Sequence, residues 1–240
     1  MRQRFWMGRA MTECDEAPRT FMGTLTSSLD NHIKLDASAR VRLAMHGVDF
    51  DGLPEREKFE ARCVEFGAHV TLWLKRVRKA GAQFRYLMVA EAHDSERTVE
   101  GMRLRPHVHM LIHEQHHGAF CPLPLKGIQD RSTGAWHEFV PDGAYLRQTW
   151  PLGFTRFEAA RDTRSAVYLC KYLTKSSLVR VRASQDYGTP PEGWYASASS
   201  DLAEAVAESV TGKGTLLHPC ETEWNNRLRN VGEGDHEISQ

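Results

Sequence analysis

Two alternating histidines, His107 and His109, are the residues of this chain whose spacing is best suited to chemistry. Successive side chains of a β-strand point to opposite faces, so Val108, Met110 and Ile112 should line one face. The two histidines then share the other face, with their Cα atoms about 6.6 Å apart along the strand. This spacing suits two ligands of one metal ion, above an apolar face that fixes the strand to a core.

A carboxylate is expected beside these histidines. Residues 84–91 are apolar on both faces except at the end, as in a central strand, and a polar connection leads from them to the histidine strand. Two strands joined in this way pair most simply as antiparallel neighbours. That pairing brings Glu91 close to His107 and His109, where its carboxylate is a plausible third ligand of a divalent ion.

A four-residue unit, Tyr-x-x-Lys, is written twice within the segment 168–175. It lies in a predicted helix that starts near Asp162 or Thr163 and ends near Leu178. At 100° per residue both tyrosines fall away from the apolar stripe and beside basic residues. The stripe comprises Ala166, Leu169, Cys170 and Leu173. The structural alternative is a pair of tyrosines that pack on each other, a weak interaction on a helix.

The tyrosines could act as nucleophiles if this helix faces the metal strand. A phenol, with a pKa of about 10, needs nearby cations that stabilise its phenolate. A divalent ion could polarise a phosphodiester, and Tyr168 or Tyr172 could attack it to leave a phosphotyrosine. Lys171 and Lys175 could hold the scissile phosphate or its neighbours. We therefore predict these four residues as catalytic.

The rest of the chain must supply the elements that position these groups. Residues 20–26 are rich in β-formers and predict a strand, followed by a loop or a short helix. Apolar residues from Glu57 onward recur at three- and four-residue spacing and predict an amphipathic helix that ends before Gly81. Residues 153–157 predict another strand, whereas residues 114–141 have the composition of a loop.

Both ends of the chain are expected to lie outside the central domain. Residues 1–18 are polar and irregular and predict a flexible arm. The main domain is then predicted over residues 19–182. Residues 183–240 are expected to form an irregular C-terminal extension with one helix at 201–210 and a frayed tail.

Composition and charge narrow the class of protein. Hydrophobic residues make up 41% of the 240 residues and charged residues 26%, as in an ordinary globular protein. No apolar run approaches the roughly 20 residues of a membrane span, and the start lacks a signal-peptide core, so we expect a cytoplasmic protein with no membrane partner. The five cysteines include no Cys-x-x-Cys pair, which argues against a zinc ribbon. Formal net charge is zero, but residues 161–182 are predominantly basic and could hold phosphates.

Three motifs together resemble those of rolling-circle replication initiators of the HUH endonuclease superfamily. The chain is most similar to the replication-associated proteins of the microviruses (Microviridae, gokushovirus-like), which are small single-stranded DNA phages. Residues 21–26, 105–112 and 168–175 resemble, in the family's order, the first-strand motif, the His-hydrophobic-His motif and the two-tyrosine motif. The resemblance covers about residues 18–180. Gly23 departs from it, because an apolar residue is expected there.

The resemblance implies an α+β fold in which helices flank a central antiparallel β-sheet, a ferredoxin-like palm. It also implies Mg²⁺ or Mn²⁺ as cofactor and site-specific nicking of origin DNA, with a 5′-phosphotyrosine intermediate and a free 3′-hydroxyl. Strand transfer and ligation would follow, one tyrosine making the first cut and the other the second. The implied partners are single-stranded and origin DNA with the host helicase and polymerase, in a bacterial cytoplasm.

Three other interpretations stay open. A histidine-triad hydrolase would need a third alternating histidine where Leu111 stands. A transposase or relaxase would share the superfamily's chemistry. A non-catalytic DNA-binding protein with a structural metal would need more ligands. Further ligands could come from His113, His116 and His117, which we interpret as loop histidines.

Overall fold

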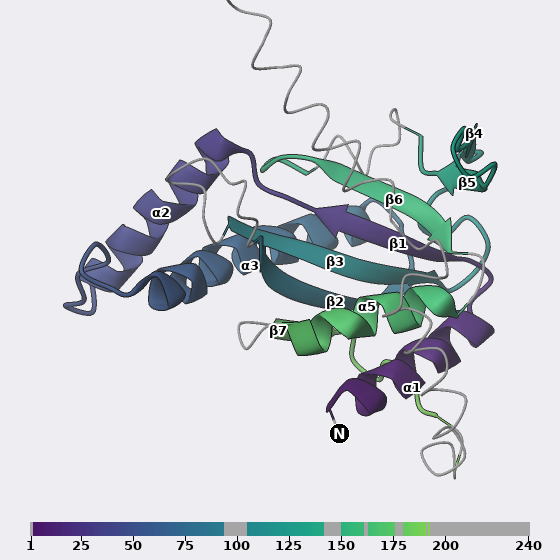
Figure 1. The fold of residues 1–240 in the computed structure, drawn as a ribbon, viewed down its shortest axis with the longest axis horizontal. Helices are drawn as coiled ribbons and strands as arrows, with labels where there is room; N and C mark the ends of the chain where they lie inside the picture. Colours follow the sequence, from purple (N-terminus) through teal and green to yellow (C-terminus); the bar gives the residue numbers. More distant parts are fainter. Residues whose placement is uncertain are drawn as a thin grey trace, which may run out of the picture. The chain divides into compact units, whose positions relative to one another are not determined.

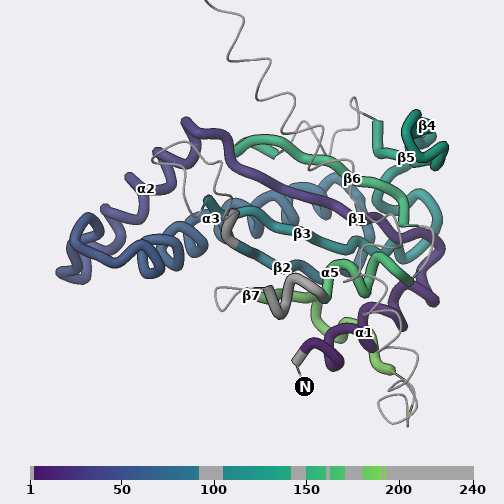
Figure 2. Tube along the Cα trace, in the orientation of Figure 1, coloured from purple at the N-terminus to yellow at the C-terminus, as the bar shows by residue number. Residues whose placement is uncertain are grey.

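The computed structural model describes residues 2–93, 105–141, 150–160, 163–175, 180–190 and 192, all within one compact unit over Met1–Ser197. The described helices are α1 Arg2–Glu16, α2 Leu29–Ala44, α3 Glu55–Lys79 and α5 Arg164–Lys175. The described strands are β1 Thr20–Leu25, β2 Phe84–His93, β3 Arg105–Glu114, β4 Lys126–Gln129, β5 Trp136–Phe139, β6 Thr155–Ala160 and β7 Arg180–Ala183. Figure 2 traces the chain through these elements.

The strands form one seven-stranded antiparallel sheet in the order β4-β5-β6-β1-β3-β2-β7. Figure 1 shows α3 behind this sheet and α5 in front of it. The predicted class, an α+β fold with a central antiparallel sheet flanked by helices, is therefore confirmed. The histidine strand is β3, which lies between β1 and β2.

The α3 face of the sheet contains the main hydrophobic core. Val108, Met110 and Ile112 of β3 are at most 2% exposed and belong to one cluster with Phe66 and Trp73 of α3. The apolar periodicity that predicts α3 in the sequence is the row of side chains that α3 buries here. The alternation of β3 thus fixes one face to the core and leaves His107 and His109 on the other.

Gly23 of β1 lies in this core beside the ring of Phe157. A Cβ built on Gly23 would come within 2.1 Å of Phe157 Cε1. The Phe157 ring stacks on Trp73, with centroids 5.9 Å apart, and also contacts Phe120. Phe157 therefore fills the apolar position that Gly23 leaves, which explains why the first-strand motif tolerates glycine there.

The opposite face of the sheet is covered by α1 and α5, which contact each other and β3. Here the buried imidazole of His113 is held from both sides. Its Nδ1 lies 2.9 Å from Thr20 Oγ1, and its Nε2 lies 2.7 Å from the hydroxyl of Tyr187, which is fully buried. Glu13 of α1 accepts hydrogen bonds from Arg85 and from the backbone N–H of Gly188. These polar contacts fasten α1 and the segment after β7 to the sheet.

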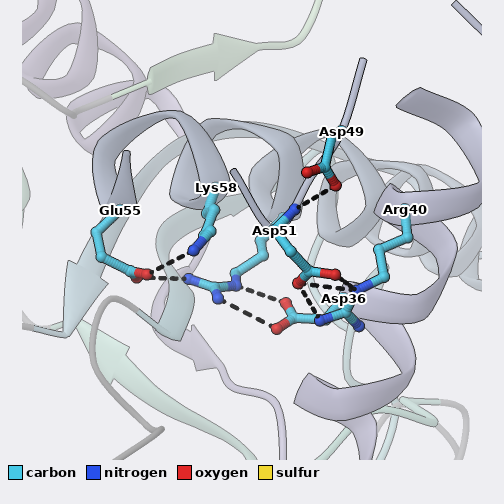
Figure 3. A network of polar contacts seen from close by, with 7 residues as sticks. Asp36, Arg40, Asp49, Asp51, Glu55 and Lys58 are labelled. Atoms are coloured by element: carbon cyan, nitrogen blue, oxygen red, sulfur yellow. Dashed lines mark hydrogen bonds and ion pairs between the residues drawn. The ribbon is translucent and has the colours of Figure 1, made fainter. Parts of the chain in front are cut away.

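Ion pairs join α2 to α3 at the end where a loop connects them (Figure 3). Arg62 of α3 donates two hydrogen bonds to Asp36 of α2, at 2.5 and 3.1 Å. Arg40 of α2 reaches Asp51 in the connecting loop at 2.7 Å. Arg62 is only 6% exposed, so its bidentate pair with Asp36 is better shielded from solvent than the exposed Arg40–Asp51 pair.

Four sequence predictions about elements are wrong. Residues 1–18 do not form an irregular arm, because Arg2–Glu16 is a helix with Met7 completely buried. The segment after Ser28 is a 16-residue helix rather than a loop or short helix. Residues 114–141 include the β4–β5 hairpin at the sheet edge. The domain does not end at residue 182 either, because Tyr187 is buried in the same unit. The helix predicted at 201–210 lies outside the described residues.

We predict that Gly23→Ala lowers the free energy of unfolding by about 1–3 kcal/mol, because the added methyl group must displace a packed Phe157 ring. Gly67→Ala is the matched control. Its Cβ would meet no atom nearer than 3.6 Å, and alanine favours the α3 helix. Urea unfolding of both variants measures the difference. Equal stability of the two variants would contradict the packing shown for Gly23.

We also predict that stability decreases with pH through His113. Burial, with a smaller contribution from the charge of Arg85, lowers the pKa of His113 to about 3. The unfolded chain therefore binds a proton below about pH 6.5 that the folded chain does not bind until about pH 3. As pH falls across this window, the free energy of unfolding should decrease by up to about 1.4 kcal/mol per pH unit.

Urea unfolding at several pH values tests this slope. His113→Gln, which does not titrate, should show a shallower pH dependence than the unmutated protein. His116→Gln changes an exposed histidine and should leave the slope unchanged. His32, whose pKa burial also lowers, contributes equally to both variants. Identical slopes for the two variants would rule out His113 as a source of the effect.

Candidate metal centre and tyrosine helix

The three side chains predicted as metal ligands meet on the α5 face of the sheet. The β2–β3 register pairs Glu91 directly with His107. Glu91 Oε1 lies 2.9 Å from His107 Nε2 and 3.4 Å from His109 Nε2. One ligand atom from each residue lies within 4.8 Å of the others. The triad therefore joins two adjacent strands, and a single ion could contact all three donors.

The triad is largely shielded from solvent. Glu91 is 7% exposed and His107 is 9% exposed, and the two imidazole rings stand nearly perpendicular with centroids 4.9 Å apart. Burial by itself would raise the pKa of Glu91. Hydrogen bonds from His107 and His109 outweigh that effect and lower the pKa to about 2. Glu91 is therefore an anionic oxygen donor at neutral pH.

This donor set fits a divalent cation. Two imidazole nitrogens and one carboxylate oxygen suit ions such as Mn²⁺, while Mg²⁺ prefers oxygen and would complete its shell with water or phosphate. Structural zinc sites usually close four protein ligands, and only three donors converge among the residues that the structure describes. A three-donor site leaves coordination positions for a substrate, as catalytic sites do.

β1 contributes a further contact that the sequence did not predict. Thr24 is the β1 partner of His109, and its Oγ1 lies 3.1 Å from His109 Nδ1. A threonine at alternate positions of a predicted strand, as Thr20 and Thr24 are, signals only a shared face. The partner of each threonine follows from the β1–β3 register, which the sequence does not contain.

The tyrosine helix α5 packs on the face that carries the triad. It contacts β3 and β2, while the other face of β3 is covered by α3. Cys170 of α5 lies near Tyr187, whose hydroxyl binds His113 on the same face. The side chains of α5 are described only as far as Cys170, so those of Lys171, Tyr172 and Lys175 lie outside the described part.

Two expectations about the tyrosine helix need correction. Tyr168 is 6% exposed, so its side chain is buried although it lies away from the apolar stripe. Arg182, counted in the basic segment, lies on the opposite face of the sheet, where it donates to Gly67 O and Thr71 Oγ1 of α3. His113 is also not a loop histidine, since it is buried within β3, whereas His116 and His117 are exposed.

The direction of α5 follows from the strands on either side of it. β6 ends level with His113 of β3, because both strands pair with Thr20 there. β7 begins level with Val108, because both strands pair with Ala90. The chain between β6 and β7, which includes α5, therefore leads from the His113 end of β3 toward the end that carries the triad.

We predict that Glu91→Gln weakens Mn²⁺ binding at least about tenfold, because an amide keeps the shape but removes the anionic donor. Glu158→Gln is the control, since Glu158 also pairs with a histidine, His137, on the same face. Isothermal titration calorimetry with Mn²⁺ on the full chain measures both affinities. Equal affinities for Glu91→Gln and the unmutated chain would remove Glu91 from the ligand set.

The comparisons with known proteins agree with this architecture. No helix in the described part of the chain has the length and apolar character of a membrane span. No curated protein and no solved structure matches the chain significantly. The sequence model of the replication-associated protein ORF2 family matches residues 53–177, which include β2, β3 and α5. The chain therefore belongs to this family of replication-associated proteins.

Proposed function

We propose that this chain is a rolling-circle replication initiator that nicks origin DNA through a tyrosine of α5. One observation carries the proposal: the tyrosine helix packs on the same sheet face as the triad of Glu91, His107 and His109. Membership of a replication-associated family supports DNA as the substrate. Single-stranded and origin DNA are the expected ligands.

The order of residues along α5 favours Tyr172 for the first cut. Tyr172 lies one turn beyond Tyr168, about 6 Å further along the helix axis. Because the chain leads toward the triad end of β3, Tyr172 is the nearer of the two tyrosines along this axis. Tyr168 is buried, and a second cut by its phenol would require the helix surroundings to open.

The proposed chemistry is a transesterification. The phenolate oxygen of Tyr172 attacks the scissile phosphorus and forms a new P–O bond, while the bond from phosphorus to the 3′-oxygen breaks. The departing 3′-oxygen takes up a proton and becomes the free 3′-hydroxyl, and the 5′-phosphate stays on the tyrosine. Attack by the 3′-hydroxyl of a later strand on this phosphotyrosine would reverse the step and ligate the ends.

The residues around the scissile phosphate have separate roles in this proposal. Glu91, His107 and His109 would hold Mg²⁺ or Mn²⁺, and the bound ion would polarise the phosphate and stabilise its developing charge. Lys171 and Lys175 would hold phosphate oxygens and favour the ionised phenol. The apolar face of β3, packed against α3, keeps the two imidazoles in place.

The biological setting is part of the proposal. The free 3′-hydroxyl would prime the host polymerase, and a host helicase would separate the strands in a bacterial cytoplasm. A microvirus origin fits the paired tyrosines, and a transposase or relaxase would use the same chemistry. A histidine-triad hydrolase has less support, since Leu111, at the third alternating position, is fully buried. A DNA-binding protein with a structural metal also has less support, because only three donors converge in the described region.

We predict that the double variant Tyr168→Phe with Tyr172→Phe forms no covalent adduct with origin DNA in Mn²⁺, while it keeps the fold. In the unmutated chain, peptide mass spectrometry after a single turnover should find the nucleotide on Tyr172. Tyr172→Phe alone should lose most of the first adduct, because its nearer phenol is removed.

Tyr86→Phe is the control, because Tyr86 of β2 packs with the core on the α3 face. This variant should form the adduct at the unmutated rate. An adduct in the double variant would show that neither tyrosine is the nucleophile. DNA binding without any cleavage by the unmutated chain would favour a non-catalytic DNA-binding protein instead.

A further inference from the structure

The contact between Thr24 and His109 bears on which nitrogen of the imidazole carries the proton. Thr24 Oγ1 lies 3.1 Å from His109 Nδ1, and His109 Nε2 lies 3.4 Å from Glu91 Oε1. A neutral imidazole has one N–H and one lone pair, so these two contacts favour opposite tautomers. With the proton on Nε2, His109 donates to Glu91 and has no lone pair there for a metal. With the proton on Nδ1, His109 donates to Thr24.

We propose that Thr24 is a positioning residue for the metal centre. Its hydroxyl oxygen accepts a hydrogen bond from Nδ1–H of His109 and so leaves the Nε2 lone pair directed at the site shared with Glu91 and His107. Histidine ligands commonly have their second ring nitrogen held in this way, and the loss of such a partner weakens metal binding. The inference rests on the proposed function, because it assigns Thr24 a role toward the same metal.

The β1–β3 pair also contains a matched contact without this role. Thr20 Oγ1 lies 2.9 Å from His113 Nδ1, in the same register four residues away. The other nitrogen of His113 is occupied by the Tyr187 hydroxyl rather than directed at a carboxylate. Both contacts join a threonine of β1 to a histidine of β3 on one face. Only the Thr24–His109 contact adjoins the triad, so the Thr20–His113 contact is a built-in control.

The fixed-register geometry makes this contact specific. Thr24 and His109 are direct cross-strand partners, and neighbouring strands lie only about 5 Å apart, so the hydroxyl reaches the ring without moving the backbone. β1 is itself paired on its other side with β6. The threonine oxygen is therefore held by two ladders of backbone hydrogen bonds, and it can fix the ring orientation of His109 as well as its tautomer.

The test compares Mn²⁺ affinity among threonine variants of the full chain, without DNA. Thr24→Val replaces the hydroxyl with a methyl group of similar size and should weaken Mn²⁺ binding about 10–100-fold. Thr24→Ser keeps the hydroxyl and should restore binding to within a few-fold of the unmutated chain. Electron paramagnetic resonance of free Mn²⁺ gives the affinities, and circular dichroism verifies that each variant is folded.

A second readout examines the tautomer directly. Nitrogen-15 shifts of the imidazole in the metal-free protein should show the Nδ1–H form of His109. They should move toward the Nε2–H form in Thr24→Val, since Glu91 then remains as the acceptor. Thr20→Val should lower the stability of the fold but leave both the Mn²⁺ affinity and the His109 shifts unchanged.

The outcomes separate this inference from the proposed function. A folded Thr24→Val variant that binds Mn²⁺ as tightly as the unmutated chain would overturn the inference alone. A Thr24→Ser variant as weak as Thr24→Val would also overturn it, because the hydroxyl would then not be the active group. An unmutated chain that binds no divalent ion would overturn the proposed metal site and the role of Thr24 with it.

Discussion

The antiparallel register of β3 with its two neighbours is the constraint on which the site depends. Pairing with β2 sets Glu91 opposite His107, and pairing with β1 sets Thr24 opposite His109. A slip of one residue in either pair would turn the partner side chains to the other face of the sheet. Because the apolar side chains on the α3 face would then be exposed, the hydrophobic core itself maintains the register that assembles the triad.

The two faces of the sheet divide the work. On one face, α3 buries aromatic and aliphatic side chains in a close-packed cluster. On the other, polar side chains of β1, β2 and β3 are brought together under α1 and α5, where each buried group needs a hydrogen-bond partner. Glu13 and Tyr187 bring elements from the two ends of this unit onto that face. The N-terminal helix is therefore part of the scaffold of the site.

Burial gives the candidate metal centre its electrostatic character. An isolated carboxylate at the depth of Glu91 would lose solvation and favour its neutral form. Two imidazoles at hydrogen-bonding distance reverse this preference, so the site holds an anion among neutral or cationic donors. His113, whose ring nitrogens contact two hydroxyl groups, has its pKa lowered instead. The same strand therefore carries histidines in two different electrostatic environments, four residues apart.

Local patterns in the sequence were sufficient for the class of fold, the β2–β3 pair and the three candidate metal ligands, because alternation and helical periodicity act between near neighbours. They also identified the tyrosine helix and the family. Only the tertiary structure placed Thr24 against His109, buried Tyr168 and Tyr187, and turned Arg2–Glu16 into a packed helix. Those features depend on which distant segments meet. A single segment cannot encode its partners across a sheet, whereas it does encode which of its own faces is apolar.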